Sequence, residues 1–277
     1  MRRNWKKNLY SCNAHHLRIY LVDTNPNNIR FSFSEADEAL FDEQQRLHLK
    51  SIEENYVELK KYILPEIEII QSGTHKEWIR ARMNSYITTS LMRLLYLTES
   101  FTGASTSFNA VTSAVHVKAM VEIPLHLAYL VWIVSEHHTF EEIRTELAKI
   151  SWGNRNPETG LTQSANITQR QFYEKADLMV QMIFKDSADT INLFETIYKE
   201  ANATGHHNYE GRNVLVGVQN KDVWKMKDRK EWFVFISKNI FQFFLQVNTI
   251  LFMSKVFVDA INHYVDQLPD YFPDKKQ

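Results

Sequence analysis

The scarcity of glycine and proline most constrains what this chain can fold into. Its 277 residues include 7 glycines and 6 prolines, whereas these residue types usually make up about 7% and 5% of a globular protein. Sandwiches, barrels and glycine-looped nucleotide-binding folds need many tight turns, so none of them is expected. Long helices joined by short connections are the favoured architecture.

The balance of apolar and charged residues narrows the class further. Hydrophobic residues make up 44% of the chain and charged residues 23%, which excludes an intrinsically disordered protein. The formal net charge is −1, so no whole-molecule field draws in nucleic acid or anionic lipid. Cys12 is the single cysteine and can form neither an internal disulfide nor a cysteine zinc cage, which fits a reducing cytoplasm.

We expect no membrane-spanning segment and no secretory signal. The basic residues 1–7 are followed by polar residues rather than by an apolar run, unlike a signal peptide. The most apolar stretch, residues 239–258, contains Asn239, Gln242 and Gln246, whose amides hydrocarbon would leave without hydrogen bonds. This stretch is predicted to be a buried helix of a cytoplasmic protein.

The first 33 residues differ in pattern from the rest of the chain. Residues 16–22 and 29–33 alternate between apolar and polar side chains, and residues 25–28 between them are turn formers. This spacing predicts a small β-hairpin extension over residues 1–33. A third alternating run, residues 213–218, could pair with that hairpin.

From residue 34 onward, apolar residues recur every three or four positions, the period of an amphipathic helix. Helices are predicted over residues 34–64, 74–103, 107–135, 139–153, 168–203 and from 222 or 228 to 268. Short connections between them favour an antiparallel bundle. Because no long linker interrupts the pattern, residues 34–277 are predicted to form one domain, a mainly all-α bundle of about six long helices.

The third predicted helix carries two titratable residues in an otherwise apolar stretch. Glu122 and His126 are four residues apart and therefore share a face, and Pro124 between them leaves one backbone carbonyl without its helical donor. One interpretation is a buried acid–base pair facing a cleft. The other is an ion pair of Glu122 with Arg93 or Lys118 that sets the helix register, because a charge in such surroundings needs a partner.

A second group of polar residues follows the fifth predicted helix. Residues 203–213 include His206, His207, Asn208, Tyr209 and Arg212, and loops on a rigid scaffold often carry binding groups. Either histidine could act as a general acid–base beside the arginine, which would hold a phosphate. The alternative is a turn that merely ends the helix.

A basic stretch lies between residues 221 and 230, interleaved with Trp224 and flanked by Trp232. Basic side chains bind phosphates and indole rings stack on bases, so this stretch is a candidate contact for RNA. Two aspartates dilute it, and a solvated helix start would look the same. The candidate RNA contacts are Lys221, Lys225, Lys227, Arg229 and Lys230.

Common cofactor and metal motifs are missing from the sequence. It contains no phosphate-loop, dinucleotide-binding, hydrolase-elbow or zinc-protease motif. We therefore expect no cofactor and no resident metal. A small-ligand or metal site inside the bundle, around Glu122, His126 and His116, stays open as an alternative.

The run from Lys118 to Glu122, followed by Ile-Pro-Leu-His-Leu-Ala-Tyr-Leu, resembles a helix of several uncharacterised bacterial all-α families. Those families carry Arg-x-x-x-Glu before an apolar stretch and a histidine-containing turn after a later long helix, to which Gly205–Asn208 is similar. They look like distant relatives of the HEPN superfamily. Spanning about residues 75–265, the resemblance implies a toxin or antiviral-defence setting, dimers and, often, metal-independent ribonuclease activity.

The sequence departs from the HEPN pattern at two points. Position 118 is Lys rather than Arg, which loses the planar fork that binds a carboxylate with two hydrogen bonds. The catalytic signature of that superfamily is an Arg followed about five to seven residues later by His, whereas no Arg of this chain is followed by His within four to seven positions. We therefore expect an interaction protein that forms a homo-oligomer or binds a protein partner, and leave open whether it is an enzyme.

Two alternatives to this interaction protein are kept. The first is a metal-independent ribonuclease or phosphodiesterase that uses His206 or His207, Arg212 and Glu122. The second is a small-ligand or metal-binding bundle around Glu122 and His126.

Overall fold

Helices account for most of the chain that the structure describes, which confirms the predicted mainly all-α class. The structure is a computed structural model. It describes residues 16–20, 28–70, 73–151, 169–185, 192–205, 216–220, 223–226, 228–240 and 242–272.

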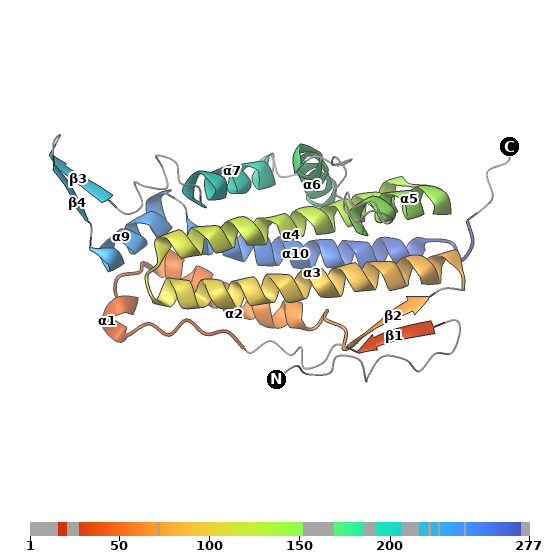
Figure 1. The fold of residues 1–277 in the computed structure, drawn as a ribbon, viewed down its shortest axis with the longest axis horizontal. Coiled ribbons are helices and arrows are strands. Elements are labelled where there is room, and N and C mark those ends of the chain that lie inside the picture. The colour runs from red at the N-terminus through yellow and green to blue at the C-terminus, as the bar shows by residue number, and fades with distance from the viewer. Residues whose placement is uncertain are drawn as a thin grey trace, which may run out of the picture.

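Four long helices lie side by side and form the body of the molecule (Figure 1). They are α2 (Glu43–Lys60), α3 (His75–Thr106), α4 (Ala110–Glu136) and α10 (Phe243–Gln267). The starts of α2 and α3 are set by capping boxes, in which Asp42 pairs with Gln45 and Thr74 with Glu77. Asn109 caps α4.

The direction of α10 departs from the antiparallel arrangement that the short connections favoured. The Asn55 amide donates to Asn248 over 2.8 Å and the Tyr62 hydroxyl donates to Asp259 over 2.6 Å. These residue numbers rise together, so α2 and α10 run parallel. Arg80, at the start of α3, pairs with Asp266 at the end of α10, so α3 runs against both.

The core is centred on α4, which contacts α3, α10, α5 (Phe140–Ser151), α6 (Gln169–Ile183) and α7 (Leu193–Gly205). Most of its side chains are buried, Pro124 included. An apolar helix of this kind needs neighbours on every side, and Figure 1 shows α6 and α7 lying across the side of α4 away from α3.

Two described helices, α4 and α10, are long and apolar enough to cross a membrane by length and composition alone. In their most apolar windows, 72% and 56% of the residues are buried against the rest of the chain. Core helices of soluble proteins meet the same criteria, so this observation is weak evidence for a membrane span.

The predicted N-terminal hairpin is wrong in its pairing. Strand β1 (His16–Tyr20) pairs antiparallel with β2 (Glu66–Ile70), which directly precedes α3. Residues 28–34 form no strand. Instead Phe31 inserts among Phe101 and Phe244, with ring centroids 6.4 and 5.9 Å away, so its apolar position reflects packing against helices.

The later β-like run also pairs differently from the prediction. Strand β3 (Val216–Asn220) pairs antiparallel with its neighbour β4 (Val223–Met226) and not with the N-terminal strand. Residues 223–226 are therefore extended, so the last predicted helix does not begin at residue 222, the earlier of its two predicted starts.

Three predicted long helices are interrupted. The first consists of α1 (Glu35–Glu38) and α2, and the last of α9 (Arg229–Phe235), a π-helical turn (Ile236–Ile240) and α10. The predicted fifth helix is two helices, α6 and α7; α7 begins directly after Asn192, which adopts a left-handed backbone with φ of 64°. Such a residue cannot continue a right-handed helix.

Candidate functional site

Helix α6 lies across α4 (Figure 1), and two groups of polar residues lie near it. The first consists of Glu122 and His126 on α4, the pair that the sequence singles out. The second lines a cavity between α6 and α7, which the sequence analysis did not predict.

Glu122 takes part in an ion pair with the neighbouring helix. The Nη2 atom of Arg93 on α3 lies 3.5 Å from its Oε2, and the two side chains are 56% and 34% exposed, with Arg93 the more exposed. This is the partner that one of the two sequence interpretations names. Lys118 lies one helical turn before Glu122 and is half-buried. A pair this accessible to water contributes little to stability.

His126 is largely covered by an aromatic ring. The centroid of the Phe172 ring on α6 lies 4.7 Å from that of the imidazole. Burial, helped by the charge of Arg93, lowers the pKa of His126, so the ring is neutral at pH 7. Tyr129, one turn further along α4, donates its hydroxyl hydrogen to Glu146 over 3.0 Å.

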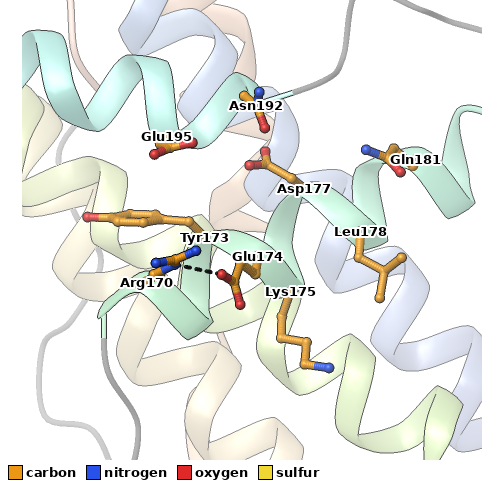
Figure 2. A pocket seen from close by; sticks show the side chains of 9 residues that line it. All are labelled: Arg170, Tyr173, Glu174, Lys175, Asp177, Leu178, Gln181, Asn192 and Glu195. Atoms are coloured by element: carbon orange, nitrogen blue, oxygen red, sulfur yellow. Dashed lines mark hydrogen bonds and ion pairs between the residues drawn. The ribbon is translucent and has the colours of Figure 1, made fainter.

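The cavity has a volume of about 740 Å³ and lies between α6 and α7 (Figure 2). The residues that line it are Arg170, Tyr173, Glu174, Lys175, Asp177, Leu178, Gln181, Asn192 and Glu195.

Asp177 is the most unusual residue of this cavity. Its side chain projects toward the start of α7 (Figure 2) and its Oδ1 accepts a hydrogen bond from the backbone N–H of Phe194 over 3.2 Å. The residue is only 7% exposed. Burial raises the pKa of Asp177 to about 6; the Phe194 bond lowers it and the charge of Glu195 raises it. No Lys or Arg within the described segments forms an ion pair with it.

The charged residues around Asp177 have partners of their own. Arg170 holds Glu174 over 2.8 Å, and Glu195 is held by Lys199 over 2.8 Å. The ammonium of Lys175 lies 4.0 Å from the centroid of the Trp132 ring and points away from Asp177 (Figure 2). The cavity therefore contains a buried carboxylate whose charge these cations do not neutralise.

Sequence reasoning missed Asp177, although a signal was present. Phe172, Ala176, Met179 and Val180 form the apolar face of α6, and Asp177 lies on the edge of that face. Burying a carboxylate at a core-facing position is costly, so the position of Asp177 beside an apolar helix face could have identified it as unusual.

The polar loop after α7 lies outside the described residues. His206, His207, Asn208, Tyr209 and Arg212 all fall there, so their predicted convergence with Glu122 and His126 stays a prediction.

The basic stretch is described only in part. Lys221 and Lys227 lie outside the described residues, as does the Lys225 side chain. Arg229 donates to the carbonyl of Phe108 over 3.1 Å and Lys230 binds Asp37 over 2.6 Å. Arg229 thus binds the turn between α3 and α4 and Lys230 binds α1, which leaves fewer cations for RNA.

Within the described residues, no group of three or more His, Cys, Asp or Glu side chains is placed to hold a metal ion. His116, which the ligand or metal alternative includes, is half-buried, and burial lowers its pKa.

No protein-family model, curated protein or solved structure matches this chain in comparisons with known proteins. Its function must therefore be argued from its own residues.

Proposed function

We propose that the protein is a HEPN-like helical interaction protein of a bacterial stress or antiviral-defence system, acting in the cytoplasm by binding a second copy of itself. The setting rests on the resemblance of residues 118–130 to bacterial all-α families. The interaction rests on one observation, the exposed apolar stripe of α10.

That stripe consists of Leu245 and Phe252, which are 37% and 45% exposed. They are seven residues apart, two helical turns, and so lie on one face. Asn248 on one flank binds Asn55 of α2 and Gln246 on the other binds Glu200 of α7. The stripe is thus the outward face of a core helix, and large apolar side chains on such a face favour contact with another protein.

The surroundings of Glu122 and His126 support binding over catalysis. A general acid–base must reach its substrate and hold a proton near neutral pH. His126 packs against Phe172 with a lowered pKa, and Glu122 is paired with Arg93.

The proposal is tested by the oligomeric state. We expect light scattering to give a dimer for the natural sequence and a monomer for Phe252→Glu, since the new carboxylate would have to be buried in the interface. Tyr271→Glu is the control, because Tyr271 is a 64% exposed aromatic residue beyond the C-terminal end of α10, and this variant should remain dimeric.

A monomer for the natural sequence at tens of micromolar, or a dimer for Phe252→Glu, would overturn the proposal. The ribonuclease alternative predicts something else: expression arrests growth, and the double variant His207→Ala with Arg212→Ala relieves the arrest.

A second function, the binding of a small ligand by the helical bundle, is favoured by the cavity between α6 and α7. The sequence placed this alternative around Glu122 and His126. The cavity is instead lined by residues of α6 and the start of α7, and neither Glu122 nor His126 is among them.

A further inference from the structure

We infer that the cavity between α6 and α7 binds a small organic cation, an ammonium or guanidinium group, through the carboxylate of Asp177. This inference does not depend on the proposed dimer. It rests on the cavity, on the burial of Asp177 and on the partners of the surrounding charges.

The first step is the cost of the carboxylate. Asp177 is only 7% exposed and lines a cavity of about 740 Å³. Of the described groups, the N–H of Phe194 is the one that donates to it. One hydrogen bond does not compensate a buried charge, and a carboxylate left without a cation destabilises the fold. A ligand cation in the adjoining space would remove that cost.

The second step is the sign of the ligand charge. Two carboxylates, those of Asp177 on α6 and Glu195 on α7, lie on facing walls of the cavity (Figure 2). The nearby cations are already held: Arg170 by Glu174 and Lys175 over the Trp132 ring. Glu195 is itself paired with Lys199, so the lining carboxylate without an ion pair among the described residues is Asp177, to which an ammonium or guanidinium group would donate hydrogen bonds.

The third step is the size and polarity of the ligand. The walls also present the Tyr173 ring and the amides of Gln181 and Asn192. An aromatic ring and amide oxygens suit an organic cation with a short apolar body. A bare metal ion is not favoured, since no cluster of three metal-binding side chains exists among the described residues.

A purely structural role for Asp177 is the competing explanation, because its bond to Phe194 caps α7. Asp177→Asn separates the two roles. The asparagine keeps an acceptor oxygen of the same size and can still cap α7, but it carries no charge. It should therefore fold and lose the ligand.

The test is calorimetric titration of the full chain with agmatine, which carries both cationic groups, at pH 7.5. We expect saturable binding of one agmatine per chain, weakened at least about tenfold in Asp177→Asn and unchanged in Asp270→Asn, an exposed carboxylate beyond α10. Binding should also weaken as the pH falls below 6, since the carboxylate gains a proton.

No saturable binding to the natural sequence would overturn the inference, as would equal affinity in Asp177→Asn. Circular dichroism of that variant shows whether it is folded. If it is not, the double variant Asp177→Ser with Glu195→Gln removes both carboxylates of the cavity. Retained affinity for agmatine in that double variant would equally overturn the inference.

Discussion

At the scale of single residues, Asp177 shows how one side chain can serve structure and remain costly. Its Oδ1 caps α7 while its charge lies in a poorly solvated place. The pKa of Asp177 is raised from 3.8 to about 6. The folded protein therefore holds this proton more tightly than the unfolded chain does. The stabilising contribution of protonated Asp177 is therefore present below pH 4 and is lost as the pH rises through 6.

Asp177→Asn should consequently stabilise the protein without ligand at neutral pH. The neutral amide keeps the cap and removes the buried charge, which is worth about 2 to 3 kcal/mol at pH 7. Urea unfolding at pH 7 and at pH 4 measures this, and the gain should vanish at pH 4. Equal or lower stability of the variant at pH 7 would show that the charge itself is needed by the fold.

At the scale of elements, the cavity lies between α6 and the start of α7. Asn192 adopts φ of 64°, and its carbonyl accepts the first helical bond of α7, from Thr196 over 3.0 Å. The N–H of Phe194 then finds its acceptor on α6 rather than on its own helix. The hydrogen bond from the Phe194 N–H to the Asp177 side chain therefore joins α7 to α6, in addition to the covalent backbone.

Replacing Asn192 should test this junction. Asn192→Ala places an ordinary L-residue in the left-handed region and should lower the free energy of unfolding by about 1 kcal/mol. Asn192→Gly relieves that strain and should be neutral or slightly stabilising. Thermal or urea unfolding of the pair gives the comparison. An alanine variant as stable as the glycine variant would contradict the left-handed conformation.

At the scale of the whole molecule, the segment before α1 belongs to the helical core. Phe31 is 7% exposed and lies against Phe101 and Phe244 from α3 and α10. Its backbone N–H donates to Glu53 of α2 over 2.8 Å. One short extended segment therefore contacts three of the four long helices.

Phe31→Ala should accordingly destabilise the whole protein. Removing a buried ring leaves a cavity among the helices, at a cost of about 3 kcal/mol. Leu40→Ala, an exposed apolar residue close by in sequence, is the control and should cost much less. Urea unfolding measures both, and a similar small loss for the two variants would place Phe31 outside the core.

Part of the fold could be predicted because it depends on local patterns. The bounds of α4 and α5 follow, to within a few residues, from side-chain period and end residues. Of the candidate site, Glu122 and its partner Arg93 could be named because a charge in an apolar helix needs a counter-ion. Asp177 could not be predicted as a site residue in this way, because its burial depends on where α7 packs against α6.

Sequence by itself therefore determined the helical class and the main helices. The scarcity of glycine and proline and the recurrence of apolar residues every three or four positions favour helix locally, over a turn or two of backbone. Tertiary structure decided which strands pair, that α10 runs parallel to α2, and that a carboxylate of α6 caps α7 beside a cavity. Those features join residues far apart in the chain. Their energies depend on packing and on exclusion of water, which no local pattern records.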